Sequence, residues 1–292
     1  MQPSGDVYGM IDETVAEIAD MQTHSSSVVA VKAAEALLAL TDREYPTVEE
    51  YVRTLERNSN ALRRANPSHA SLQTTQREIL RTVEDSDAAS VEDAKETTRA
   101  VVDEVVQRVQ NAKERAAARA ADYLEDGATV LTHDYSSTVL EAIERAADDG
   151  RSLTVYCTEA RPRYLGRKLA RTLAGVDGVD ARLVVDSASG HFLPECDQVM
   201  VGMDCIVDDT LYNRIGTYPL AATAADAGVP VRVVGAESKV VDGAFQFENE
   251  DRVTSEVIRE PADGFGVENP AYDATPTRLL DAAITDEAVH EF

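Results

Sequence analysis

From about residue 126 onward, short apolar segments rich in valine alternate with segments of helical periodicity. The apolar segments are bounded by Gly, Asp or Pro, as is typical of strands buried inside a sheet. Because strands separated by helices run parallel, this alternation predicts an α/β fold with a doubly wound parallel sheet and helices on both faces. The predicted strands are 128–131, 153–156, 181–185, 199–202 and 231–234, and the predicted helices are 137–148, 163–174 and 218–227.

Before residue 125 the pattern is helical throughout. Thr47 followed by Glu50 is a capping box that predicts the start of a helix over 48–65. Further helices are predicted by apolar spacing at 11–22, 28–40, 69–84 and 90–125, with the serines at 25–27 as a candidate cap. The last of these helices either pairs with another chain or connects two domains, and its irregular apolar spacing favours the connection. We therefore predict a helical domain over 1–125 and a second domain over 126–292.

The chain is strongly acidic, with 28 Lys and Arg against 53 Asp and Glu and a net charge of −25. This sign disfavours direct binding to a nucleic acid backbone or to an anionic membrane surface. In molar salt the screening length falls to about 3 Å, so such a surface no longer repels itself strongly. The charge thus predicts a cytoplasmic protein from a salt-loving organism, and the alternative is an ordinary acidic protein.

Other sequence signals exclude several classes of protein. No apolar segment is long enough to span a membrane, and the first residues show no signal-peptide pattern. Cys157, Cys196 and Cys205 form no CxxC pair, which argues against a disulfide framework and a structural zinc site. No phosphate-binding glycine motif is present. We expect no metal and no organic cofactor.

Polar residues follow each predicted strand, where open α/β sheets bind their ligands. Arg161, Arg214 and Lys239 lie near strand ends and are natural contacts for an anion. The hydroxyls of Ser136 and Ser137 stand at the start of a predicted helix, a position that suits phosphate. The pattern indicates a site for a small anionic ligand, and the alternative is a solvated rim without a ligand.

One further position at a strand end leaves alternatives open. His133 next to Asp134 suits acid–base chemistry or structural capping equally. Cys157 lies in a predicted strand and is expected to belong to the core. Cys205 follows Asp204 directly, and strand neighbours face opposite sides, so we do not expect Cys205 to be a nucleophile.

The strand-end loops, taken in order, resemble one known family. It contains the alpha, beta and delta regulatory subunits of eukaryotic translation initiation factor 2B, the archaeal ribose-1,5-bisphosphate isomerases and the methylthioribose-1-phosphate isomerases. The matching motifs are T-E-x-R-P, V-G-x-D and N-[KR]-I-G-T, within LTHDYSSTVLEAIERA (131–146), TEARPRYLGRKLARTLA (158–174), VVDSASGHFLPECDQVMVGMDCIVDD (184–209), NRIGTYPLAATAADAGVPVRVVGAESK (213–239) and NPAYDATPTRLLDAAIT (269–285). The T-H-x-Y-S loop is similar to the alpha-subunit type.

The resemblance implies a Rossmann-like sugar-phosphate-binding domain over 126–292. It implies ligand contacts from the strand-end loops, at His133, Ser136, Ser137, Glu159, Arg161, Asn213, Arg214 and Lys239. Asp204 matches a carboxylate that transfers protons in the isomerases. Arg214 stands where the family usually has Lys, which keeps the charge but changes the donor geometry. From the residues themselves, we expect Glu159 to orient Arg161 through a charge-assisted hydrogen bond.

Two departures from the family pattern decide the functional prediction. Asp134 stands at the position of the isomerases' catalytic Cys, and the segment 22–27 lacks their R-G-A motif. If Asp134 and Asp204 share a pocket, one carboxyl has a raised pKa. These departures predict a regulatory protein like initiation factor 2B, which binds a phosphorylated sugar or nucleotide without isomerase activity and has a possible translation-factor partner.

The alternative is a sugar-phosphate isomerase of the ribose-1,5-bisphosphate type. It would use Asp204 for proton transfer, with Asp134 in place of the thiol. The apolar strip 199–211 and the resemblance both predict a homodimer or a higher homo-oligomer.

Overall fold

The computed structural model describes residues 6–20, 26–67, 69–241, 245, 247–249, 251–260 and 263–292. The chain forms two compact units, Met1–Asn111 and Ala112–Phe292. The change from helices to strands near residue 125 lies inside the second unit, and the predicted domain division at this position stays a prediction. No helix in the described ranges is long and apolar enough to cross a lipid bilayer.

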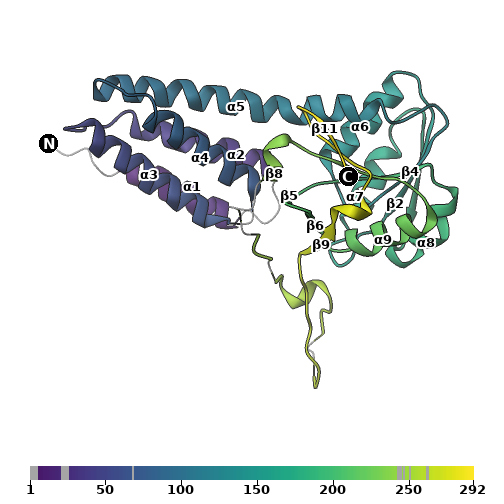
Figure 1. Ribbon diagram of the computed structural model, residues 1–292. Helices are drawn as coiled ribbons and strands as arrows, with labels where there is room; N and C mark the ends of the chain where they lie inside the picture. Colours follow the sequence, from purple (N-terminus) through teal and green to yellow (C-terminus); the bar gives the residue numbers. More distant parts are fainter. Residues whose placement is uncertain are drawn as a thin grey trace. The chain divides into compact units, whose positions relative to one another are not determined.

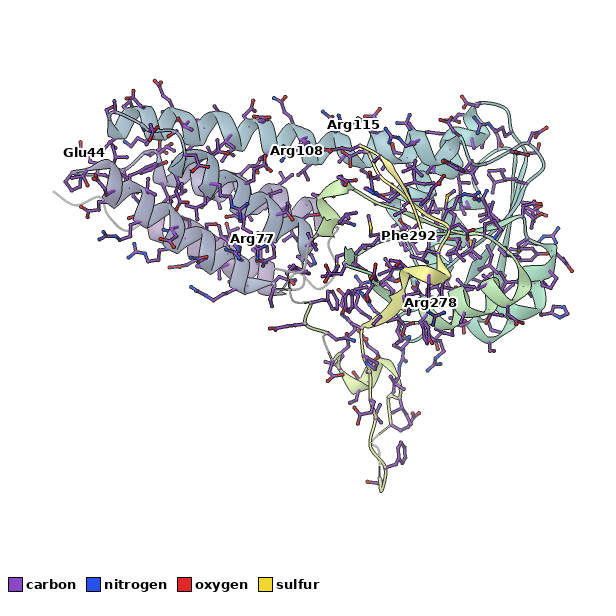
Figure 2. The ribbon with its side chains drawn as sticks, viewed as in Figure 1. Glu44, Arg77, Arg108, Arg115, Arg278 and Phe292 are labelled. Atoms are coloured by element: carbon purple, nitrogen blue, oxygen red, sulfur yellow. The ribbon has the colours of Figure 1, made fainter. Side chains whose placement is uncertain are left out.

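The first unit is helical. Its elements are α1 (Asp6–Asp20), α2 (Ser26–Ala36), η1 (Leu37–Leu40), α3 (Val48–Ala65), α4 (Ala70–Glu84) and the first part of α5 (Val91–Ala121). The Thr47 hydroxyl accepts a hydrogen bond from the Glu50 amide at 3.2 Å, so the predicted cap of α3 is confirmed. Arg108 of α5, which is labelled in Figure 2, forms an ion pair with Glu78 of α4. The candidate cap Ser25 and most of the segment 22–27 lie outside the described residues.

The core of this unit consists of apolar side chains spaced by three, four or seven residues along each helix. Leu55 and Leu62 of α3 and Leu72 and Ile79 of α4 are fully buried. Tyr51 is also fully buried, and its hydroxyl donates to the Thr98 hydroxyl at 2.7 Å. A satisfied hydroxyl lets this large side chain enter the core without loss of a hydrogen bond.

The second unit is built on a sheet in the order β11-β10-β7-β4-β1-β2-β3. Figure 1 labels its strands β2, β4 and β11. Its strands are β1 (Thr129–Thr132), β2 (Leu153–Thr158), β3 (Val179–Val184), β4 (Gln198–Gly202), β7 (Val231–Val234), β10 (Ala282–Ile284) and β11 (Val289–Glu291). All pairings are parallel except that of β11, an antiparallel edge strand. The predicted doubly wound parallel sheet is confirmed.

Helices pack on both faces of this sheet, because alternate residues of each strand face opposite sides. On one face Val130, Val155 and Met200 pack with the last part of α5, α6 (Ser137–Asp148) and α7 (Leu165–Leu173). On the other face Leu131 and Val199 pack with α9 (Thr217–Ala227) and the short elements before β4. Strands buried on both faces explain the continuous apolar segments in the sequence.

A second, four-stranded sheet in the order β8-β5-β6-β9 was not predicted. Its strands are β5 (Cys205–Val207), β6 (Thr210–Arg214), β8 (Val240–Val241) and β9 (Tyr272–Pro276). β5 and β6 form a hairpin that turns at Asp208, whose φ is +48°. These strands are too short for an alternating pattern to show in the sequence. The remaining short elements are η2 (Asp186–Ala188), α8 (Ser189–Phe192), η3 (Leu193–Glu195), η4 (Glu237–Lys239), η5 (Thr254–Glu256) and η6 (Thr277–Leu279).

Candidate functional site

The candidate site lies at the centre of the large sheet, where β1 and β4 are neighbours and the strand order reverses. From this point β2 and β3 extend to one side, and β7 and β10 extend to the other. Such a reversal leaves a crevice outside the carboxyl ends of the two central strands. The loop after β1 carries Asp134, and the loop after β4 carries Asp204.

Arg214 brings these two carboxylates into one arrangement. Its Nε lies 3.8 Å from Asp134 Oδ2 and 3.6 Å from Asp204 Oδ2. These distances are those of ion pairs without a direct hydrogen bond. The side chain of Asp134 is 12% exposed, that of Asp204 is 23% exposed and that of Arg214 is 27% exposed. In this partly dry setting one guanidinium offsets the repulsion between two carboxylates.

The small sheet positions Arg214. Arg214, the last residue of β6, is paired across the sheet with Tyr272, the first residue of β9. The guanidinium lies over the Tyr272 ring at 4.9 Å from its centroid. A planar guanidinium stacks on an aromatic face, whereas an ammonium is more strongly hydrated.

Asp134 has two features that suit a reacting group. Its backbone lies in the left-handed region, with φ of +63°, which Asp tolerates better than most residues. Its Oδ1 is buried and has no hydrogen-bond partner among the described residues. A buried carboxylate oxygen without a partner is costly, so a ligand group that donates to it would bind favourably.

A narrow cleft, partly open to solvent, adjoins Asp134. Four arginines line it, namely Arg161, Arg163, Arg214 and Arg252, with Asp134 as the one carboxylate among its lining residues. Such a concentration of positive charge in a chain of net charge −25 indicates an anionic ligand. Arg163 and Arg252 are not among the ligand contacts predicted from the sequence. Arg163 directly follows the T-E-x-R-P motif, whereas nothing near Arg252 in the sequence marks it.

The T-E-x-R-P loop differs from the prediction at Glu159. Glu159 Oε2 accepts from Arg167 Nη2 at 2.6 Å and does not pair with Arg161, so the expected bond is wrong. Arg161 donates to the Tyr164 hydroxyl and to the Val257 carbonyl. Arg167 lies in the first turn of α7, and its long side chain reaches back to Glu159. Spacing along the sequence could not decide between the two arginines.

Lys239 supports the Asp204 loop. Its Nζ donates to the carbonyl of Met203 at 2.6 Å, next to Asp204 in the chain. Burial lowers the pKa of the Lys239 ammonium, and the nearby Asp204 carboxylate acts in the opposite direction. Lys239 therefore brings a second positive group, after Arg214, close to Asp204.

A model of the initiation factor 2 subunit family matches residues 22–291. This chain belongs to the initiation factor 2 subunit family. A crystal structure of translation initiation factor eIF-2B from Pyrococcus horikoshii is similar to it, with a TM-score of 0.76 and 25% identity, over 98% of this chain and 97% of the other.

Relatives in the family correct the functional prediction. A ribose 1,5-bisphosphate isomerase from Haloferax volcanii is 31% identical over 96% of this chain and 88% of its own length. A ribose 1,5-bisphosphate isomerase from Methanocaldococcus jannaschii is 31% identical over 95% of this chain and 90% of its own length. The prediction of a regulator without isomerase activity is contradicted, because relatives that match nearly the whole chain are named isomerases.

Four of the predicted ligand residues shape the loops of this family member. His133 Nε2 lies 2.8 Å from the Ile215 carbonyl, which can only accept, so Nε2 carries a proton. The other ring nitrogen lies 2.6 Å from the Thr158 hydroxyl. The other three residues also have structural roles. Ser136 accepts a hydrogen bond from the Val139 amide and caps α6, which begins at Ser137. Asn213 donates a hydrogen bond to the Thr217 hydroxyl at 3.0 Å. None of the four lines the cleft as the described residues form it, and their contact with a ligand stays a prediction.

No thiol takes the place of the isomerases' Cys in this family member. Cys157 and Cys205 are fully buried. Burial raises the pKa of Cys157 to about 12, and burial together with Asp204 raises the pKa of Cys205 further. Among the residues that the structure describes, no group of three His, Cys, Asp or Glu side chains could hold a metal ion.

Proposed function

We propose that this chain is a sugar-phosphate isomerase that converts an aldose 1-phosphate into a ketose phosphate, with ribose 1,5-bisphosphate as its substrate. The observation that carries this proposal is the pair of carboxylates, Asp134 and Asp204, on either side of Arg214 at the strand reversal. The relatives named ribose 1,5-bisphosphate isomerase support the choice of substrate.

The reaction rearranges atoms within one molecule. The bond between C1 and the ring oxygen breaks, and the ring oxygen takes up a proton to become the C4 hydroxyl. C2 loses its hydrogen and its hydroxyl proton and becomes a carbonyl, while C1 gains one hydrogen. The hydrogen count is unchanged, so no redox partner is needed. Such a sequence calls for one group that donates a proton and one that accepts.

Two carboxyl groups can supply both functions when one is protonated and the other is ionised. We assign Asp204 to hydrogen transfer between C2 and C1, and Asp134 to proton transfer at the ring oxygen in place of the isomerases' thiol. Arg214 stabilises negative charge that develops on the sugar oxygens. Arg161, Arg163 and Arg252 in the cleft supply contacts for phosphate.

The working conditions follow from the charge. We infer that the protein functions in concentrated salt as a homo-oligomer, because a net charge of −25 opposes association unless it is screened. The named relative from Haloferax volcanii supports this inference.

Turnover of ribose 1,5-bisphosphate in concentrated KCl, followed by phosphorus NMR, tests the proposal. We expect formation of ribulose 1,5-bisphosphate, and we expect Asp204→Asn to abolish it. Asp226→Asn is the matched control, because Asp226 is exposed on α9. No conversion by the unaltered protein would refute the proposed function, and full activity of Asp204→Asn would refute the role of Asp204.

A further inference from the structure

Arg163 differs from the other three arginines of the cleft. Its guanidinium has no hydrogen bond or ion pair within the described part of the chain, although the side chain is half-buried. Arg214 pairs with Asp134 and Asp204, and Arg252 forms a bidentate pair with Glu256 at 2.8 and 2.9 Å. A half-buried cation without a partner has lost water without compensation, which favours capture of an anion.

The charges around Arg163 add to this effect. Burial lowers the pKa of Arg163, and the guanidinium groups of Arg252 and Arg214 lower it further. Glu256 and Asp134 act in the opposite direction, but each already faces its own arginine. A second unit of positive charge comes from Arg161, whose hydrogen bonds go to neutral groups. Two arginines of the cleft, Arg161 and Arg163, therefore form no ion pair with a carboxylate among the described residues.

Arg163 also lies at the junction of two hollows. It lines the cleft beside Asp134 and a second, wider and more open cleft formed with the segment 255–260. Arg161 and Pro162 line both as well. A ligand with its sugar beside Asp134 would therefore meet Arg163 where the first cleft opens into the second.

We propose that Arg163 binds one of the two phosphate groups of the substrate and makes the site selective for a bisphosphorylated sugar over a monophosphorylated one. This inference rests on the proposed function. The planar guanidinium donates two parallel hydrogen bonds to a phosphate, which Lys cannot do.

Binding measured by calorimetry in concentrated KCl tests the role of Arg163. All variants carry Asp204→Asn so that the sugar is not consumed, and the ligands are ribose 1,5-bisphosphate, ribose 1-phosphate and ribose 5-phosphate. We expect Arg163→Met to weaken the bisphosphate and one of the monophosphates about ten- to a hundredfold, the range for a charged hydrogen bond. The other monophosphate should change less than twofold, and Arg163→Lys should recover part of the loss.

Arg171→Met is the control, since Arg171 is exposed on α7 and its loss changes the net charge equally. Arg163→Met should keep its thermal midpoint without ligand, because Arg163 forms no hydrogen bond or ion pair with the residues that the structure describes. Equal weakening of all three sugars, no weakening at all, or a large fall in the midpoint would each overturn the inference.

Failure of the proposed function gives a different result. In that case the unaltered protein fails to convert ribose 1,5-bisphosphate in the NMR assay. If the enzyme turns over but the selectivity of Arg163→Met is unchanged, the role of Arg163 alone is refuted.

Discussion

The guanidinium of Arg214 lies 3.6 Å from the carboxylate of Asp204, and this ion pair forms where the chain passes from one sheet to the other. Asp204 lies between β4 of the large sheet and β5 of the small one, while Arg214 ends β6 of the small sheet. The small sheet thus places the Arg214 guanidinium at the carboxyl ends of the strands of the large sheet. Asp134 at 3.8 Å from the same Nε completes the arrangement.

Replacement of Arg214 by Lys tests whether the guanidinium itself is required. Lys keeps the charge but loses the stacking on Tyr272 and the fixed donor plane. We expect kcat/KM for ribose 1,5-bisphosphate to fall about 10- to 100-fold in Arg214→Lys, and further in Arg214→Met. Arg278→Lys, at an exposed position of η6 labelled in Figure 2, is the control. Wild-type kinetics in Arg214→Lys would show that charge alone suffices.

Gly216 is a steric requirement of the loop that leads into α9. A Cβ there would meet the His133 ring at 2.6 Å, and the φ of Gly216 is +105°. We expect Gly216→Ala to lower the free energy of unfolding by about 2–4 kcal/mol, since overpacking adds to backbone strain. Gly228→Ala is the matched control, because its φ is +70° but its Cβ would enter open space.

Urea unfolding of both glycine variants measures the difference. Gly228→Ala should lower the free energy of unfolding by about 1 kcal/mol, from backbone strain alone. Equal losses in the two variants would mean that His133 moves aside without cost.

The pair of Glu256 and Arg252 predicts a pH-dependent contribution to stability. The hydrogen bond from Arg252 is the main cause that lowers the pKa of Glu256 below its ordinary value. A carboxyl whose pKa falls on folding stabilises the folded state above its ordinary pKa, and this contribution disappears as the pH falls through the folded value. We expect Glu256→Gln to lower the free energy of unfolding by about 1–3 kcal/mol at pH 7. The loss should be small at a pH where Glu256 is protonated in both the folded and the unfolded state.

Urea unfolding at pH 7 and at successively lower pH checks this effect. Glu260→Gln serves as the control, because Glu260 is exposed in the same segment. A loss in Glu256→Gln that stays constant as the pH falls would show that ionisation of Glu256 does not contribute.

The three cysteines should be inert in the folded protein. All are buried, and burial raises the pKa of Cys157 to about 12 and that of Cys196 to about 11. Because the thiolate is the reactive form, we expect almost no reaction with a thiol reagent at pH 8 and no loss of activity. All three thiols should react after unfolding. Rapid inactivation of the folded protein would instead indicate an accessible catalytic thiol.

Much of the fold was predictable because it depends on local periodicity. The helix over 48–65 and the strand over 231–234 were predicted with the bounds that the structure has. Buried parallel strands are continuous apolar segments, and caps such as Thr47 mark helix starts within a few residues. The hairpin β5–β6 escaped prediction, since strands of three to five residues show too few alternations.

Part of the candidate site could be predicted from the sequence in the same way, and part could not. The sequence placed Asp134 and Asp204 just after predicted strands, because the apolar segments 128–131 and 199–202 precede them. Three further relationships became visible in the folded chain alone: Arg214 joins the two carboxylates, Glu159 binds Arg167, and Arg163 has no partner among the described residues. Long charged side chains reach several residues in any direction, so their partners depend on strand order and on packing across the sheets, which local spacing does not encode.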